Sequence, residues 1–111
     1  MKTKHRSCLA HQEREAISQL HGLLNKQGLL RASFVRVRRS CGRAYCRCMR
    51  SKRNWHQGWY IVQRHGGRPR MKYIPLEMQE KVRQWIARYG AVKELLNEVS
   101  DVYWEAIKKK P

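Results

Sequence analysis

A group of three cysteines and one histidine lies near the middle of this chain of 111 residues. The group comprises Cys41, Cys46, Cys48 and His56, with the spacing C-x4-C-x-C-x7-H. Cys46 and Cys48 flank a single residue, so both thiols lie on the same side of an extended segment. Structural zinc sites use such thiolate and imidazole ligands in a tetrahedral arrangement. The spacing therefore predicts a Zn(2+) site formed by these four residues.

The fourth ligand is the least fixed member of this set. His65, Cys8 or a residue of a second chain could replace His56. Buried thiols without a metal, or an iron–sulfur cluster held by three thiolates and a histidine, are the alternative chemistries. The arginines around the cysteines favour the thiolate form that binds metal, because they lower the pKa of a thiol. A catalytic zinc would need a nearby acid or base, and the surrounding sequence contains no Asp or Glu.

Basic residues dominate the charge of the chain. The formal net charge is +17, from 25 Lys and Arg against 8 Asp and Glu. The segment from Ala16 to Leu76 contains no acid but 14 Lys or Arg. An excess of this size usually indicates a nucleic-acid partner, DNA or RNA, because phosphates relieve the repulsion. A soluble, highly charged protein without such a partner is the alternative.

The sequence predicts no association with a membrane. No apolar run reaches the length of a membrane span, and the basic N-terminus lacks the apolar stretch of a signal peptide. We therefore expect a cytoplasmic location, in the prokaryotic cytosol or nucleoid. Thiols stay reduced there, which favours metal binding over disulfides. Cys8 lies apart from the other cysteines and is expected to be a lone thiol in a helix.

Periodicity predicts a helix, a small sheet and a second helix. Apolar residues at helical spacing indicate a helix at about 8–27, which Ser7 could cap and Gly28 could end. Alternating residues predict strands at 33–39, 59–64 and 70–74, with a glycine turn between the last two. The expected fold is α+β and one domain overall, with an N-terminal helix (1–28), a zinc-stapled, three-stranded antiparallel sheet (29–75) and a long C-terminal helix (76–111).

The C-terminal helix, expected at about 76–108, carries apolar residues at alternating steps of four and three, as in a coiled coil. This stripe comprises Met78, Val82, Trp85, Tyr89, Val92, Leu96, Val99, Tyr103 and Ala106. It continues through Gly90, so one helix is expected, with two helices hinged at Gly90 as the alternative. The stripe is longer than the N-terminal helix can cover. Its uncovered part is expected to contact a second copy, as a homodimer, or a partner protein. Antiparallel packing of the two helices within one chain is the alternative.

The central basic block is expected to bind nucleic acid, because most of its charges are arginines, which bind phosphate in bidentate fashion and stack on bases. The predicted contact residues are Arg36, Arg38, Arg39, Arg43, Tyr45, Arg47, Arg50, Lys52, Arg53, Trp55, Arg64, Arg68, Arg70 and Lys72. Tyr45 and Trp55, beside the cysteines, are the candidates for base contacts. Trp59 and Tyr73 are expected to form the small core. Basic and aromatic side chains together favour single strands, RNA or distorted duplex over groove reading by a helix.

The cysteine run and the residues after it resemble a family of small uncharacterised prokaryotic and phage-type domains. The shared features are Ser33, Arg39, the run from Cys41-Gly42 to Cys46-Arg47-Cys48, His56, Gly58-Trp59-Tyr60, a Gly-Gly turn and a long helix. The family motif reads S-x-R-x-R-x-C-G-K-P-x-C-x-C and then H-G-P-Y; here Gln57 separates His56 from Gly58, and Arg43-Ala44 replaces Lys-Pro. The resemblance implies that the three cysteines and His56 are ligands, and that the setting is a mobile element. It implies no activity.

These features predict a nucleic-acid-binding zinc protein, a regulator or accessory factor of a mobile element or phage. The alternative is a protein-interaction module, such as an inhibitor or a ribonucleoprotein subunit, that uses the long helix. An enzyme is not expected, because the basic half has no carboxylate pair for magnesium and offers only His21, His56 and His65 as bases.

Overall fold

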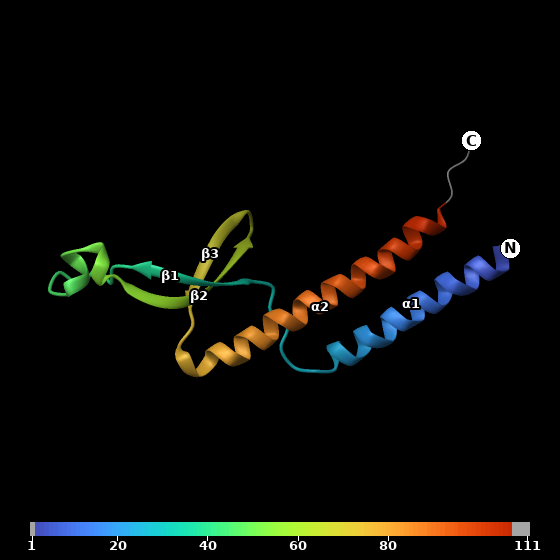
Figure 1. The fold of residues 1–111 in the computed structure, drawn as a ribbon, viewed down its shortest axis with the longest axis horizontal. Coiled ribbons are helices and arrows are strands. Elements are labelled where there is room, and N and C mark those ends of the chain that lie inside the picture. Colours follow the sequence, from blue (N-terminus) through green and yellow to red (C-terminus); the bar gives the residue numbers. More distant parts are fainter. Residues whose placement is uncertain (1, 108–111) are drawn as a thin grey trace. The chain divides into compact units, whose positions relative to one another are not determined.

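The computed structural model describes residues 2–107, with side chains described for 11–107. It confirms the α+β class, with an N-terminal helix, a three-stranded antiparallel sheet and a long C-terminal helix (Figure 1). In chain order the elements are α1 (Lys2–Leu24), β1 (Ser33–Arg39), the short 3-10 turns η1 (Arg47–Met49) and η2 (Lys52–Asn54), β2 (His56–His65), β3 (Arg68–Tyr73) and α2 (Leu76–Ala106). None of these helices is long and apolar enough to cross a membrane.

The chain divides into two compact units, with the division inside α2. The helical unit comprises Met1–Leu29 and Ala87–Pro111, and the sheet unit comprises Leu30–Ile86. The sequence predicted a single domain with boundaries between its helical and sheet regions near residues 28 and 75. That prediction remains a prediction.

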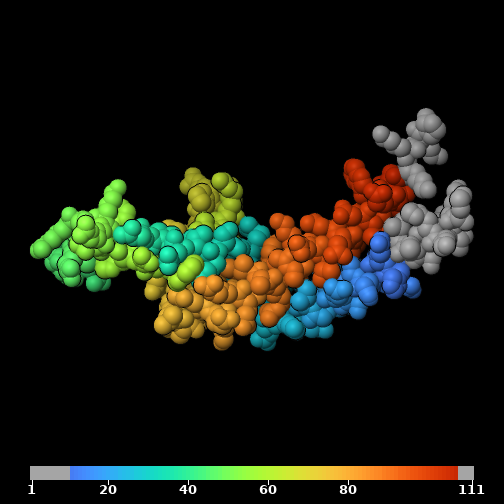
Figure 2. Space-filling view, viewed as in Figure 1, coloured from blue at the N-terminus to red at the C-terminus, as the bar shows by residue number. Residues whose placement is uncertain are grey.

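In the helical unit, α1 packs antiparallel against the second half of α2 (Figures 1 and 2). The Tyr103 hydroxyl lies 2.7 Å from a carboxylate oxygen of Glu13, and Arg88 donates to the carbonyl of Gly28 at 2.7 Å. The later of the two α2 residues thus contacts the earlier of their two partners, as the antiparallel arrangement requires. The buried core comprises Ala16, Leu20, Val92 and Leu95, flanked by Leu23 and Val99.

The buried side of α2 differs from the predicted heptad stripe. Leu95, which the heptad pattern omits, is only 7% exposed, whereas Leu96, which it includes, is 54% exposed. An α-helix has 3.6 residues per turn, so its inner face drifts away from a strict repeat of 3.5 residues. α1 therefore packs on the side of Val92, Leu95 and Val99 and leaves Leu96 and Tyr103 exposed at the edge.

The helix boundaries correct two details of the sequence prediction and confirm a third. α1 begins at Lys2, so Ser7 lies within the helix and is not its cap. α1 ends at Leu24, and Gly28 lies in the connection with a φ of 99°, a left-handed conformation that glycine adopts readily. α2 runs continuously through Gly90, so the alternative of two hinged helices is wrong. The predicted helix end at 108 lies outside the described residues.

The sheet unit is built on the strand order β1-β2-β3, with β2 in the centre and both pairings antiparallel. Arg36 pairs with Trp59 across the first interface, and Tyr60 pairs with Tyr73 across the second. The predicted glycine turn is confirmed: Gly66 and Gly67 have φ values of 60° and 80°. Pro69 lies on the edge strand β3, where proline is tolerated because it need not donate to a further strand.

The two faces of the sheet have different neighbours, and one of them contacts α2. On the face that we call the covered face, Phe34 and Trp59 stack with ring centroids 4.9 Å apart. The guanidinium of Arg83 in α2 lies 4.5 Å from the Phe34 centroid and 4.9 Å from the Trp59 centroid. Alternation along the strands places Val35, Val37, Gly58, Tyr60, Val62, Met71 and Tyr73 on the opposite face, which we call the open face.

The expectation that Tyr73 belongs to the core is wrong. Tyr73 is 56% exposed and its neighbour on the same face, Met71, is 48% exposed. Trp59 is half-buried between Phe34 and Arg83, as expected for a core residue. The two rings differ because Trp59 lies on the central strand and contacts Phe34 and Arg83, whereas Tyr73 lies on the edge strand β3, all of whose residues are exposed.

Candidate metal centre and nucleic-acid interface

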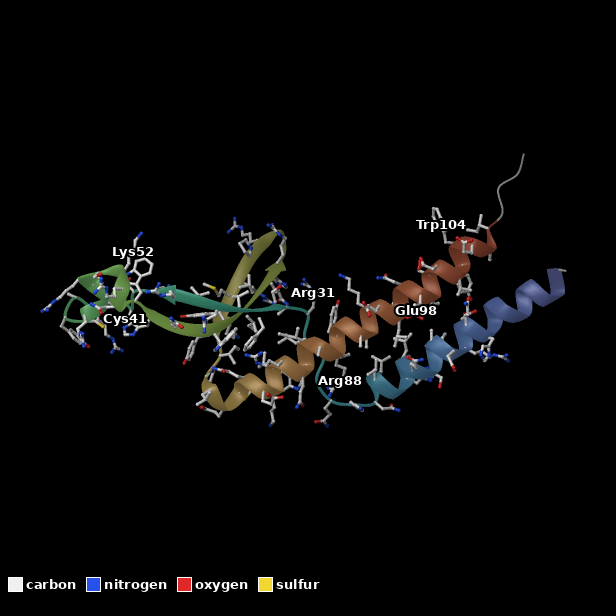
Figure 3. All side chains as sticks on the ribbon, viewed as in Figure 1. Arg31, Cys41, Lys52, Arg88, Glu98 and Trp104 are labelled. Carbon is white, nitrogen blue, oxygen red and sulfur yellow. The ribbon has the colours of Figure 1, made fainter. Side chains whose placement is uncertain are left out.

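The sheet register brings the two ends of the cysteine segment together. Arg39, the last residue of β1, pairs with His56, the first residue of β2. The segment between them, residues 40–55, forms a small lobe at the end of these two strands, which we call the metal lobe; Figure 3 labels Cys41 and Lys52 within it. Cys41, two residues after Arg39, therefore lies close to His56. The chain after Cys41 must turn back toward the start of β2 within a few residues. Gly42 permits that turn with a φ of 81°.

The four predicted ligands converge in the metal lobe. One donor atom from each of Cys41, Cys46, Cys48 and His56 lies within 4.8 Å of all the others. The Sγ atoms of Cys41 and Cys48 are 3.6 Å apart, and Cys46 Sγ is 3.2 Å from His56 Nε2. A tetrahedral zinc ion with Zn–S bonds of about 2.3 Å separates its sulfur ligands by about 3.8 Å. The donors are therefore close enough to hold one metal ion with little adjustment.

The alternative ligand His65 cannot join this group. His56 and His65 are the first and last of the ten residues of β2, which places them roughly 30 Å apart at the rise of a strand. The side chain of Cys8 lies outside the described residues. Among the described side chains, His56 is the one that completes the donor set.

The surroundings prepare Cys46 to bind a metal as an anion. Its pKa is lowered to about 6, first by the backbone N–H of Cys48 and then by the His56 side chain and the other two thiols. At neutral pH this side chain is therefore mostly a thiolate, the form that metals bind.

Cys48 is the buried member of the set, with 1% of its surface exposed. The backbone N–H of Cys41 donates to Cys48 Sγ at 3.3 Å and favours its thiolate. Burial and the neighbouring thiols outweigh that bond, so the pKa of Cys48 is raised overall. A bound cation would offset this cost, because positive charge favours the ionised thiol.

Hydrogen bonds to the backbone hold the rest of the metal lobe in shape. Arg38 donates to the carbonyl of Lys52 at 2.8 Å, and the Asn54 amide donates to the carbonyl of Arg47 at 3.3 Å. The Ser51 hydroxyl accepts the N–H of Arg53 at 3.1 Å and caps the second 3-10 turn. These bonds link the end of β1 to both short turns, so the position of the ligands depends on the strands.

All fourteen predicted nucleic-acid contacts lie in the sheet unit, and every one of them except the half-buried Trp55 is exposed. They fall into three groups. Arg36, Arg38, Arg68, Arg70 and Lys72 share the covered face, whereas Arg39 and Arg64 share the open face. The metal lobe carries Arg43, Tyr45, Arg47, Arg50, Lys52, Arg53 and Trp55. The structure thus spreads the predicted contacts over both faces and the lobe.

Some of the basic side chains already have local partners. Arg36 lies 5.9 Å over the Trp59 ring, and the amine of Lys52 lies 5.7 Å over Trp55. Arg70 donates to the Gln63 side chain at 2.7 Å, and Arg64 donates to the carbonyl of Gly67 at 2.9 Å. None of these partners is a carboxylate, since the segment from Ala16 to Leu76 contains no Asp or Glu. The positive charge of this segment is held in place and has no acidic residue within the segment to neutralise it.

Two features were missed by the sequence prediction. Arg83 stacks on Phe34 and Trp59, although it lies in the helix and not in the basic block. Tyr60 and Tyr73 form an edge-to-face pair, with centroids 5.5 Å apart, on the open face. Strand alternation predicts that Tyr60 and Tyr73 can share a face once their register is known, but it does not say which face a helix covers.

A family model described as a domain of unknown function (DUF6788) matches residues 10–84. This range includes most of α1, the whole sheet with its metal lobe, and the first turns of α2. Comparisons with curated proteins and with solved structures gave no match.

Proposed function

Since the chain belongs to the family described as Domain of unknown function (DUF6788), we propose its function from its own residues: it binds DNA or RNA through the basic sheet unit, which a structural zinc ion holds in shape. The single observation that carries the proposal is the group of exposed arginines around the Cys3His donor set, in a segment without acids. Phosphates are the anions that such arginines bind best.

Zinc is the metal that the donor set fits best. Three thiolates and one imidazole are a common ligand set of structural zinc sites, and all four positions come from the protein. Cys41, Cys46, Cys48 and His56 would hold the ion, which supplies a crosslink and no reaction. The absence of a carboxylate near the site supports a role without catalysis, so we propose a binding protein and not an enzyme.

The biological setting follows from the sequence resemblance alone. That resemblance implies a setting near mobile elements or phages, so we propose that this protein is a regulator or accessory factor of such an element and acts in the cytoplasm. DNA and RNA both present the phosphates that the arginines would bind.

The proposal predicts binding that weakens steeply with salt. A fluorescently labelled oligonucleotide should show tight binding at low salt, with a slope of log K against log salt of about −3 or steeper, because each phosphate contact contributes roughly −0.7 to −0.9. Fluorescence anisotropy between about 50 and 200 mM NaCl measures this slope. Absent binding at low salt, or a flat slope, would contradict the proposal.

An exposed apolar stripe supports a second function, self-association through the helical unit. Ile17 and Leu24 in α1 are 37% and 51% exposed, and Leu96 and Tyr103 in α2 are 54% and 55% exposed. Spacings of seven place each pair on one side of its helix, and the bond from Tyr103 to Glu13, one turn before Ile17, places the two pairs on the same flank. A single exposed stripe thus runs along both helices.

A second copy of this chain is the occupant that we propose for the stripe. Among the side chains described in the helical unit, those of Ala16, Leu20, Val92 and Leu95 are the ones fully buried, a small core for two helices. Two antiparallel pairs placed stripe to stripe form a four-helix bundle, the usual way to bury such surfaces. A two-fold axis lets one stripe contact its own equivalent.

Dimerisation can be tested with neighbouring substitutions of equal charge. Leu96→Glu should convert a dimer into a monomer of 13.3 kDa, because it places a carboxylate in the stripe. Asn97→Glu, on the exposed side one residue further, should leave the dimer intact. Sedimentation equilibrium distinguishes the two, and a wild-type protein that is monomeric at all concentrations would refute the proposal.

A further inference from the structure

The open face of the sheet carries a row of apolar and aromatic side chains that no charged residue interrupts. Val35 pairs with Tyr60, and Tyr60 pairs with Tyr73, so the row crosses all three strands. Tyr73 is 56% exposed and Met71, beside it on β3, is 48% exposed. Tyr60, on the central strand, is half-buried. A group of exposed apolar side chains such as Met71 and Tyr73 often marks an interaction site.

Gly58 helps to fix the orientation of the two tyrosine rings. A Cβ atom at this position would lie 3.2 Å from Cε1 of Tyr60 and 3.2 Å from Cε1 of Tyr73. Both rings therefore extend over the backbone of Gly58, where a Cβ atom would require them to move by a few tenths of an ångström. The tyrosines are held by each other and by the strand, so their exposed surfaces form a preorganised apolar platform.

Positive charge lies at both ends of this row. Arg39 shares the open face, and its guanidinium lies 5.9 Å over the Tyr60 ring. Arg64 shares the same face near the turn, and the metal lobe beyond Arg39 contributes further arginines. A platform with aromatic rings between arginines is complementary to bases between phosphates. It is a poor match for an intact duplex, because paired bases do not expose their faces.

We propose that the open face binds a single-stranded nucleic acid, with a base stacked on the exposed ring of Tyr73, which Tyr60 supports, and phosphates held by Arg39 and the arginines of the metal lobe. This inference rests on the proposed nucleic-acid binding and adds to it the form of the ligand. Stacking tolerates every base, so the contact is expected to show little sequence preference.

The test compares a single-stranded oligo-dT, the same strand with abasic sites, and a duplex of equal length. The abasic strand keeps the phosphates but lacks the bases, so it should bind roughly 10- to 100-fold more weakly than oligo-dT. Equal binding of the abasic strand and oligo-dT would overturn the stacking proposal and leave phosphate binding intact. Failure of all three to bind would instead overturn the proposed function itself.

Variants then locate the platform. Tyr73→Ala should weaken binding of oligo-dT roughly 5- to 100-fold with an unchanged salt slope, and Tyr73→Phe should restore it, because the ring stacks and the hydroxyl does not. Trp104→Ala is the control: this side chain is 76% exposed, belongs to the helical unit and projects away from α1 (Figure 3).

Two other results would overturn the assignment. If Tyr45→Ala weakens binding and Tyr73→Ala does not, bases contact the metal lobe instead of the open face. If Tyr73→Ala changes sedimentation of the free protein but not its affinity for oligo-dT, the open face is a protein interface. Metal content and circular dichroism, measured on each variant, exclude misfolding as the cause of a lost affinity.

Discussion

Removal of the metal is expected to lower the melting temperature of the protein by about 10 °C or more. The metal lobe has only one fully buried side chain, Cys48, and no apolar core of its own. The sulfur atoms of Cys41 and Cys48 lie 3.6 Å apart, so two thiolates at these positions would repel each other without a cation to hold them together. Structural zinc sites contribute several kcal/mol to folding, and each kcal/mol shifts the melting temperature of a small domain by about 4–8 °C.

Paired substitutions separate the ligands from other residues of the same type. Cys48→Ser and His56→Gln should lose stoichiometric metal and the associated stability. Cys8→Ser, which keeps the whole Cys3His set, and His65→Gln, at the opposite end of β2, should each retain one metal ion per chain. Elemental analysis and thermal circular dichroism measure both properties. A protein without stoichiometric metal, whose melting temperature a chelator does not change, would show that the predicted metal site is wrong.

The second large effect is expected from the arginines of the metal lobe. Replacement of Arg43, Arg47 and Arg50 by Gln should weaken binding of a labelled oligonucleotide by about 10- to 100-fold at moderate salt. All three side chains are exposed and lie in a segment without acids, so phosphates are their natural partners. The salt slope should also become shallower by about 2 to 3, since each lost phosphate contact removes up to about one.

A second triple variant serves as the control for the change in total charge. Replacement of Arg14, Lys26 and Lys93 by Gln removes the same number of charges from the helical unit, where all three side chains are exposed. This variant should bind within about twofold of wild type, because the proposal assigns no phosphate contact to the helical unit. Equal losses in both variants would mean that net charge, and not the metal lobe, controls binding. Elemental analysis confirms that each variant keeps its metal.

The sequence predicted those parts of the fold that depend on local chemistry. Gly66 and Gly67 identified the hairpin, because tight turns between strands have positions with positive φ, and glycine is favoured there. The cysteine spacing identified the donor set. A short segment between two paired strands turns back on itself and can bring its thiols within a few ångströms of one another.

Features that depend on packing between distant elements could not be read from the sequence. The choice between Leu95 and Leu96 as the buried residue depends on where α1 lies against α2, and a heptad pattern does not contain that information. The exposure of Tyr73 likewise depends on the position of β3 at the edge of the sheet, where both of its faces are exposed. Arg83 was not identified because a charged helical residue gives no sign in the sequence that it stacks on an aromatic pair.

The central claim is that a bound metal holds the sheet unit in the shape that binds nucleic acid. The most direct measurement is the affinity of the protein for a labelled oligo-dT in three states: metal-loaded, stripped by a chelator, and reloaded with zinc. The account predicts that affinity falls by at least about tenfold, or about 1.4 kcal/mol, on stripping and returns with zinc. An unchanged affinity in a protein that elemental analysis shows to be metal-free would contradict it.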